Sequence, residues 1–200
     1  MAKIKICGLS RTCDIECVNR WLPDFCGFVF AEKSRRYVSR EQAAGLKAML
    51  SPAIKAVGVF VNASPEVTAD YAEAGIIDLI QLHGQEDETY LRRLRTMTGC
   101  PVIQAFSVRG AEDIRKAERS SADYILLDHG AGGTGKAFDW QILSGLERPY
   151  FLAGGLTPDN VEQAVRDYSP YALDISSGVE TNGWKDPDKI EKCIRRIRNV

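Results

Sequence analysis

Ala172-Leu173-Asp174-Ile175-Ser176 is the eighth short apolar run of this 200-residue sequence, and its presence distinguishes between two α/β folds. Stretches of helix-like composition separate the runs, and this alternation predicts parallel strands joined by helical crossovers. Five or six strands would suit a doubly wound open sheet, whereas eight can close into a (β/α)8 TIM barrel, a fold that needs at least about 200 residues. We therefore predict a single TIM-barrel domain over residues 1–200, in which the first and last strands are neighbours. The seven earlier runs are Ile4–Cys7, Phe25–Phe30, Ile54–Val61, Ile76–His83, Pro101–Phe106, Tyr124–Asp128 and Tyr150–Ala153.

The composition narrows the classes of partner. A hydrophobic fraction of 44% and a charged fraction of 26% are typical of a soluble globular protein, and a net charge of −1 gives no reason to expect binding to nucleic acid or to an anionic membrane. No stretch approaches the roughly 20 consecutive apolar residues that span a bilayer. The apolar part of the N-terminal segment is too short for a signal peptide, so we expect a cytoplasmic protein whose six cysteines remain thiols.

Local signals predict several helix starts. Ser39, followed by Glu41 and Gln42, has the pattern of a capping box before the segment 41–50. Ser64-Pro65-Glu66 places an N-cap, a proline at the first helical position and an early acid in order, and Thr157-Pro158-Asp159 repeats this arrangement. The final segment, 187–198, carries isoleucines at helical spacing and arginines near its end.

Cys7 ends the first apolar run, and functional groups in parallel α/β sheets gather at the carboxyl ends of strands. On a strand, Lys3, Lys5 and Cys7 share one face. Because the outer face of a barrel packs on helices, Lys5 and Cys7 are predicted to point into the lumen. An ammonium one layer below the thiol would lower its pKa, which suits a base or nucleophile. The alternative is that Cys7 is a small buried hydrophobe.

Asp128 ends the sixth run and opens the glycine-rich segment 129–136. A carboxyl group facing a partly closed lumen could hold a raised pKa and serve as a general acid, although an acid after an apolar strand is often only a turn residue. The same segment nearly matches a nucleotide-binding P-loop. However, Ala137 stands where a hydroxyl should bind Mg²⁺, and only a short helix, Phe138–Leu143, is predicted to follow. We therefore do not expect nucleotide hydrolysis.

Two glycine-containing loops follow the seventh and eighth strands. Gly154 and Gly155 lie in the first loop, and Ser176, Ser177 and Gly178 lie in the second. Backbone N–H groups at glycines can approach an anion closely, and barrels often bind phosphate between these two loops. Either loop alone would be interpreted as a turn. Together they predict a phosphate site, and hence a small phosphorylated ligand.

Three further residues are candidate ligand contacts. Arg36, which follows the second strand, would either belong to a solvated basic loop or hold a second anion, such as a carboxylate, through a bidentate contact. Gln81 and His83 share the inward face of the fourth strand, although His83 could equally be a hydrogen-bonded histidine at the rim. The cysteines lack paired CxxC spacing and the two histidines lie far from them in sequence, so no metal site is predicted.

Together these motifs resemble those of the phosphoribosylanthranilate isomerase family. The matches fall on seven of the eight predicted strand ends, in order, and cover the chain from end to end. They are Lys5-Ile6-Cys7-Gly8, Gly27-Phe28-Val29-Phe30, Ser34-Arg35-Arg36-Tyr37, Gly58-Val59-Phe60-Val61-Asn62, Gln81-Leu82-His83-Gly84, Leu126-Leu127-Asp128, Gly132-Gly133-Thr134-Gly135 with Phe138-Asp139-Trp140, Gly154-Gly155-Leu156, and Asp174-Ile175-Ser176-Ser177-Gly178-Val179-Glu180.

The resemblance implies a small TIM barrel of tryptophan biosynthesis that needs neither metal nor organic cofactor. The implied reaction is an Amadori rearrangement, an aldose–ketose isomerisation of N-(5-phosphoribosyl)anthranilate to 1-(o-carboxyphenylamino)-1-deoxyribulose 5-phosphate. In this assignment Cys7 is the general base and Asp128 the general acid. Arg36 would hold the anthranilate carboxylate, and the loops 154–155 and 176–178 would hold the phosphate. The expected assembly is a monomer or homodimer.

Two further hypotheses follow from the residues themselves. A noncatalytic barrel that binds a phosphorylated ligand is the rival function, and the presence of both Cys7 and Asp128 argues against it. Asp174 lies on the same face of the last strand as Ser176, one layer lower. Because closure makes the first and last strands neighbours, and opposite charges that face a lumen should not stay unpaired, we predict an ion pair between Asp174 and Lys5.

Overall fold

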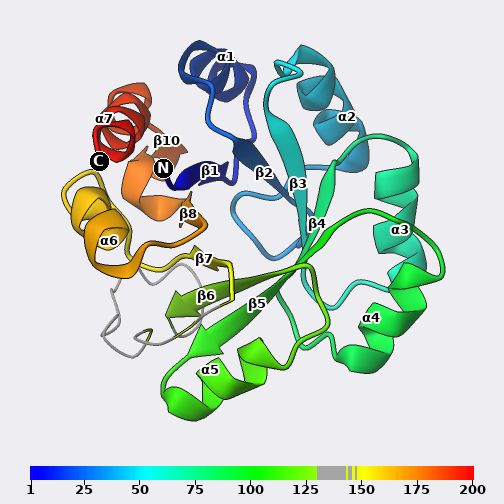
Figure 1. Cartoon of the computed structure of the whole chain (residues 1–200). Helices are drawn as coiled ribbons and strands as arrows, with labels where there is room; N and C mark the ends of the chain where they lie inside the picture. Colours follow the sequence, from blue (N-terminus) through cyan, green and yellow to red (C-terminus); the bar gives the residue numbers. More distant parts are fainter. Residues whose placement is uncertain (130–142, 144–145, 147) are drawn as a thin grey trace.

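The computed structural model describes residues 1–129, 143, 146 and 148–200. Eight parallel strands form a closed barrel in sequence order, with β1 and β8 as neighbours, so the predicted TIM-barrel architecture is confirmed (Figure 1). The strands are β1 (Lys3–Cys7), β2 (Phe25–Val29), β3 (Lys55–Phe60), β4 (Leu79–Leu82), β5 (Val102–Val108), β6 (Tyr124–His129), β7 (Tyr150–Leu152) and β8 (Ala172–Ile175).

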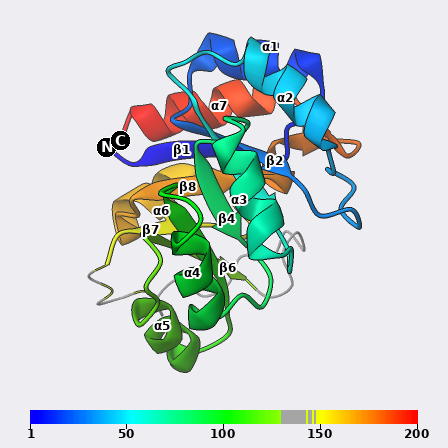
Figure 2. The same cartoon turned by 90° about the vertical axis from the view of Figure 1, so that its right-hand side faces the viewer.

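Helices surround the barrel, as the end-on and side views show (Figures 1 and 2). A short 3₁₀ helix, η2 (Ser177–Val179), follows β8, and a small antiparallel hairpin of β9 (Glu180–Thr181) and β10 (Trp184–Lys185) leads into the last helix. No periodic pattern in the sequence predicts this hairpin. The α-helices of the described segments are α1 (Thr12–Trp21), α2 (Arg40–Met49), α3 (Pro65–Glu73), α4 (Glu88–Arg95), α5 (Ala111–Glu118), α6 (Val161–Tyr168) and α7 (Pro187–Arg198).

Most of the predicted helix starts are confirmed. The Ser39 hydroxyl accepts a hydrogen bond from the Gln42 backbone, and the Gln42 side chain accepts one from the Ser39 backbone, which completes the capping box of α2. Ser64 caps α3, whose first residue is Pro65. The predicted start at Thr157 is wrong. Residues 158–160 form a turn instead, and α6 begins at Val161.

The fourth strand is several residues shorter than its apolar run, whereas the other strands differ from theirs by one or two residues at an end. Ile76 and Ile77 belong to the run that was predicted as a strand, but β4 begins only at Leu79. Both isoleucines are buried in the core, so their apolar character reflects packing rather than strand structure.

The barrel interior is filled in layers. A lower layer is apolar and includes Phe25, Val57, Leu79, Ile103, Leu126, Phe151 and Ala172. The next layer up contains the buried polar side chains Lys5, Gln81 and Asp174. Gln81 and Asp174 each lie two residues after a residue of the lower layer on the same strand, and Lys5 is paired in register with Asp174. A larger apolar core fills the space between the outer face of the strands and the helices. The polar layer therefore lies directly beneath the carboxyl-terminal mouth of the barrel.

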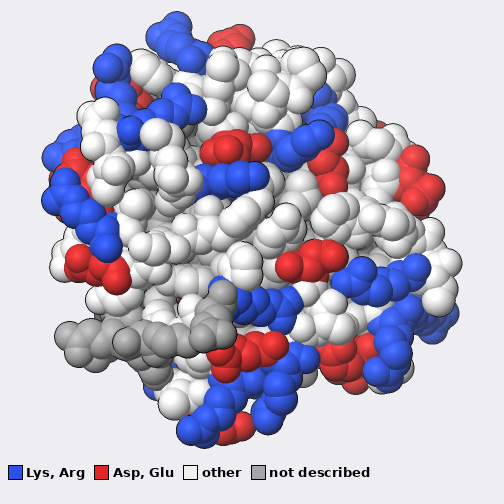
Figure 3. Space-filling view, in the orientation of Figure 1, with Lys and Arg blue, Asp and Glu red and all other residues white. Residues whose placement is uncertain are grey.

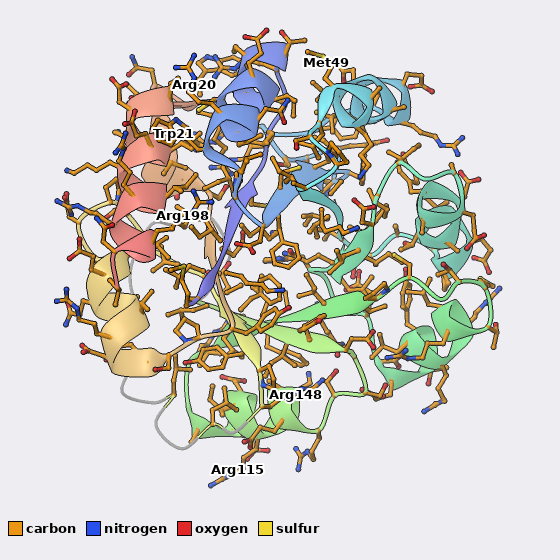
Figure 4. All side chains as sticks on the ribbon, turned by 45° about the horizontal axis from the view of Figure 1, so that its top comes forward. Arg20, Trp21, Met49, Arg115, Arg148 and Arg198 are labelled. Carbon is orange, nitrogen blue, oxygen red and sulfur yellow. The ribbon has the colours of Figure 1, made fainter. Side chains whose placement is uncertain are left out.

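Contacts between the first helix, α1, and the last helix, α7, close the helical ring. The guanidinium of Arg195 in α7 lies 4.8 Å from the ring centroid of Trp21 in α1, a residue labelled in Figure 4. The two chain termini lie close together in Figure 2, and Met1 and Val200 line one hollow at the surface. Basic and acidic side chains are interspersed over the face shown in Figure 3. Among the described helices, none is long and apolar enough to cross a membrane.

Candidate active site

A cavity of about 280 Å³ lies at the carboxyl ends of the strands. Its walls are apolar where Val29, Val59 and Leu156 contribute, and the remaining lining carries a small number of polar groups, which is typical of a small-molecule site. Every predicted site residue except Gly178 lines this cavity: Cys7, Arg36, Gln81, His83, Asp128, Gly154, Gly155, Ser176 and Ser177. The barrel therefore brings together residues that are far apart in the sequence.

Cys7 is the last residue of β1, and its side chain faces the cavity. The neighbouring position on β2 is Gly27, and a Cβ atom there would lie only 2.6 Å from the Cys7 Sγ atom. Burial raises the pKa of the Cys7 thiol, while the nearby ammonium groups of Lys5 and Lys185 act in the opposite direction. The expectation of a lowered thiol pKa is therefore wrong, because burial outweighs the favourable charge of Lys5.

Asp128 lies in β6 and faces the same cavity from across the barrel, since β7 and β8 separate β6 from β1 on one side. Its carboxylate Oδ2 lies 3.7 Å from Nε2 of His83, and the residue is only 8% exposed. The glycine-rich segment 130–136 lies outside the described residues, and so does the predicted helix Phe138–Leu143 apart from Leu143.

The predicted ion pair inside the barrel is confirmed. Lys5 and Asp174 are partners in the register of β1 and β8, and their Nζ and Oδ2 atoms are 2.9 Å apart. Burial alone would lower the pKa of Lys5, but Asp174 and Cys7 more than compensate, and the pKa is raised. The second oxygen of Asp174, Oδ1, is buried beside the cavity and finds no hydrogen-bond partner among the described residues. It is available to accept a hydrogen bond from a ligand.

Gln81 and His83 continue this polar layer toward Asp128. Lys5 Nζ donates a hydrogen bond of 2.8 Å to Gln81 Oε1, and Gln81 Nε2 lies 2.9 Å from His83 Nδ1. Burial lowers the pKa of His83, which favours the neutral ring. His83 is therefore hydrogen-bonded to the buried polar layer, and its side chain also lines the cavity.

Arg36 is anchored by a residue to which the sequence analysis gave no role. Its Nε and Nη2 atoms donate hydrogen bonds of 2.6 and 3.0 Å to the two carboxylate oxygens of Glu180. The Arg36 side chain also passes over Gly8, where a Cβ atom would lie 2.3 Å from Cδ of Arg36. Its Nη1 atom has no hydrogen-bond partner among the described residues and remains free for a ligand anion.

Glu180 is shared by three cations. Besides Arg36, it accepts hydrogen bonds from Arg35 at 2.6 Å and from Lys185 at 2.7 Å. Burial favours the neutral carboxyl, but Arg36 and Lys185 outweigh burial and lower the pKa of Glu180. The sequence did place Glu180 within a matched motif. Lys185 carried no comparable signal, apart from the turn-forming Asn182-Gly183 pair just before it.

The two predicted phosphate loops lie against each other. Gly154 and Gly155 have positive φ values of 87° and 68°, which side chains disfavour, and both line the cavity. Gly178 stands behind the lining, where a Cβ atom would lie 1.8 Å from the backbone oxygen of Leu156. Gly178 therefore supports the site by allowing the two loops to approach.

All six cysteines of the chain are free thiols. Within the described residues, no group of three or more histidine, cysteine, aspartate or glutamate side chains is arranged to hold a metal ion.

Comparisons with known proteins agree with this geometry. The family model for N-(5'phosphoribosyl)anthranilate (PRA) isomerase matches residues 4–196. The N-(5'-phosphoribosyl)anthranilate isomerase of Clostridium kluyveri is 45% identical over 202 residues, which cover all of both chains. A solved phosphoribosylanthranilate isomerase, in complex with reduced 1-(o-carboxyphenylamino)-1-deoxyribulose 5-phosphate, is similar with a TM-score of 0.90 and 35% identity over all of both chains.

A second solved structure contains monomers of the dimeric isomerase of Thermotoga maritima. It is similar to this chain with a TM-score of 0.89 and 35% identity, again over all of both chains. The match of the family model and the identity to the relatives both extend over nearly the whole sequence. The chain therefore belongs to the N-(5'-phosphoribosyl)anthranilate isomerase family.

Proposed function

We propose that this chain isomerises N-(5-phosphoribosyl)anthranilate to 1-(o-carboxyphenylamino)-1-deoxyribulose 5-phosphate, a step of tryptophan biosynthesis, with Cys7 as general base and Asp128 as general acid. The observation that carries the assignment is that the two side chains line one cavity from separate sides of the barrel. A proton donor and a proton acceptor that face one bound sugar are what an aldose–ketose isomerisation requires.

The lining offers a contact for each charged end of this substrate. The loops 154–155 and 176–178 would hold the phosphate through backbone N–H groups at glycine-rich turns. Arg36 would hold the anthranilate carboxylate through Nη1, since Glu180 already occupies Nε and Nη2. The free Oδ1 atom of Asp174 would accept a hydrogen bond from a hydroxyl or amine of the substrate.

Asp128 would begin the reaction by giving its proton to the ring oxygen of the ribose. The bond between C1′ and that oxygen breaks, and the nitrogen lone pair forms a protonated imine at C1′. The positive imine makes the proton on C2′ acidic. His83, whose Nε2 atom lies 3.7 Å from Asp128 Oδ2, borders the carboxylate that this step leaves behind.

Cys7 thiolate would then remove the C2′ proton. The electron pair moves into a C1′–C2′ double bond and neutralises the imine, which gives an enolamine that tautomerises to the ketone. Burial raises the pKa of the Cys7 thiol, so its thiolate is scarce but strongly basic, and Lys5 and Lys185 oppose that rise. Each proton transfer of this type contributes roughly 10²–10⁴ in rate.

Compartment and assembly are parts of the same proposal. Six free cysteines suit a reducing cytoplasm, where we place the reaction. A monomer or a homodimer is expected in solution, because the isomerase of Thermotoga maritima is dimeric and has also been solved as monomers.

A steady-state assay with phosphoribosylanthranilate tests the function. We expect the anthranilate-type fluorescence of the substrate to change with multiple turnovers in the absence of added metal or cofactor. A noncatalytic binding barrel is the alternative. Saturable binding of the reduced product analogue without any turnover of substrate would establish that alternative and refute the isomerase.

A further inference from the structure

Three side chains, those of Lys5, Gln81 and His83, form a row from the buried polar layer of the barrel to Asp128. Lys5 donates to Gln81 over 2.8 Å, Gln81 lies 2.9 Å from His83, and His83 lies 3.7 Å from Asp128. Lys5 and Gln81 are buried, at 0% and 1% exposure, so water does not compete for the hydrogen bond between them. Asp174 holds the other side of the Lys5 ammonium at 2.9 Å.

Lys5 fixes the orientation of the Gln81 side-chain amide. An ammonium carries only hydrogen-bond donors, so Gln81 must turn its carbonyl oxygen, Oε1, toward Lys5. The amide nitrogen of Gln81 then faces His83, and that nitrogen has donors only. The ring nitrogen it meets, Nδ1 of His83, must therefore be an acceptor without a proton.

We propose that Lys5 and Gln81 are positioning residues that hold His83 as the neutral tautomer with its proton on Nε2, so that the ring directs an N–H toward the carboxyl group of Asp128. The fixed tautomer would make Asp128 a stronger acid, since an N–H donor favours the carboxylate that remains after the proton has moved to substrate. The other tautomer would direct a lone pair at that carboxylate and disfavour the same step. The role of Asp128 as acid is taken from the proposed function.

The surroundings of His83 keep its ring neutral. Burial lowers the pKa of His83, and the charge of Lys5 acts in the same direction, whereas Asp174 opposes it. A second proton on Nδ1 would also collide with the amide hydrogens of Gln81. Lys5, Asp174 and Asp128 are buried charged groups that belong to this row of side chains or contact it, and the Cys7 thiol lies close to Lys5.

The protonation state of the ring is measured directly by long-range ¹H–¹⁵N correlation spectra of uniformly ¹⁵N-labelled enzyme without ligand. The chain has only two histidines, His83 and His129, so a His83→Asn variant identifies the signals of His83. We expect Nδ1 of His83 to resonate as an unprotonated ring nitrogen and Nε2 as a protonated one near neutral pH. A protonated Nδ1 in the unmodified enzyme would overturn the inference.

Substitution of Gln81 tests the cause. Gln81→Glu offers His83 an acceptor in place of a donor, so we expect the proton to appear on Nδ1 and kcat to fall about tenfold to a hundredfold. Gln81→Met has a similar volume and no hydrogen bonds, and we expect a mixture of tautomers with a smaller fall in kcat. An unchanged pair of ¹⁵N signals in Gln81→Glu would refute the positioning role.

The same spectra separate this inference from the proposed function. If Asp128→Asn retained near-normal turnover while His83 kept its proton on Nε2, the acid assignment would fail and the tautomer assignment would stand. If Asp128→Asn were inactive but the unmodified enzyme carried the proton on Nδ1, the acid assignment would stand and the present inference would fail.

Discussion

Arg36 and Glu180 form a bidentate ion pair beside the cavity, with Nε–Oε1 and Nη2–Oε2 distances of 2.6 and 3.0 Å. Glu180 follows β8 and Arg36 follows β2, so the pair links two loops on either side of β1. A guanidinium held by two of its nitrogens is fixed in direction before the substrate arrives, which lowers the cost of binding a carboxylate at the third.

Glu180→Gln is expected to raise KM for phosphoribosylanthranilate about tenfold and to lower the free energy of unfolding by about 1–3 kcal/mol, because three cations lose their shared anion. The lowered pKa of Glu180 means that its stabilising effect is complete above the ordinary glutamate pKa of about 4.3 and is lost as the pH falls further. Steady-state kinetics and denaturant unfolding between neutral and acid pH check both effects. An unaltered KM would contradict the role assigned to Glu180.

Lys5 is expected to ease ionisation of the Cys7 thiol. Lys5→Met alone would leave Asp174 as an unpaired buried charge, so the test uses Lys5→Met together with Asp174→Asn. Peptide-resolved alkylation with iodoacetamide across pH should show the midpoint for Cys7 shifted upward in this double variant, since Lys5 lowers the Cys7 pKa more than Asp174 raises it.

Cys17 provides the internal reference for that measurement. It lies on α1 outside the barrel, and burial raises its pKa to about 11. Its alkylation midpoint should be the same in both proteins. A Cys7 midpoint that did not move, or moved downward, would show that Lys5 does not favour the thiolate.

Gly27→Ala is expected to displace the Cys7 thiol, the proposed general base, without unfolding the barrel. The added Cβ atom would meet Cys7 Sγ at 2.6 Å, and a shift of this kind lowers kcat by about 10- to 100-fold. Gly45→Ala is the matched control, because Gly45 lies on the exposed face of α2 and an added Cβ atom there would meet no neighbouring atom within 4 Å. This variant should leave kcat unchanged and stabilise the helix by about 0.5–1 kcal/mol. Equal kcat values in the two variants would contradict this account of Gly27.

Gly178→Ala tests the contact between the two loops that are proposed to hold the phosphate. Its Cβ atom would lie 1.8 Å from the Leu156 carbonyl oxygen, so the loops must separate. We expect KM for the substrate and the inhibition constant for inorganic phosphate to rise together, each about tenfold. Gly99→Ala, which has open space around it, is the control. A rise in KM without any change in phosphate inhibition would place the phosphate elsewhere.

Much of the architecture could be predicted from two regularities, the repeated alternation of strands and helices along the chain and the alternation of inward and outward residues along each strand. The alternation of strand residues, combined with closure of the barrel, was sufficient to predict the Lys5–Asp174 pair, because both residues sit at fixed positions on neighbouring strands. The position of Cys7 and Asp128 beside the cavity could be predicted for the same reason, because both lie at or next to the ends of regular strands. Strand ends are the part of this fold that a sequence specifies best.

The features that could not be predicted depend on irregular backbone or on balances between opposing effects. Glu180 and Lys185 reach the site through a hairpin whose path no periodic pattern describes. The Cys7 pKa depends on burial and on Lys5, which act in opposite directions, and only the packed structure shows that burial dominates. The start of α6 was misplaced because Thr157-Pro158 forms a turn before the helix instead of its first residues.

The most direct test of the central claim is the turnover number of Cys7→Ala and of Asp128→Asn with phosphoribosylanthranilate, measured beside the binding of the reduced product analogue. Both residues line the cavity, and neither substitution adds volume. The account predicts that each variant loses at least about 10²- to 10⁴-fold in kcat while analogue binding stays within a few-fold of that of the unmodified enzyme. A near-normal kcat in either variant would contradict it.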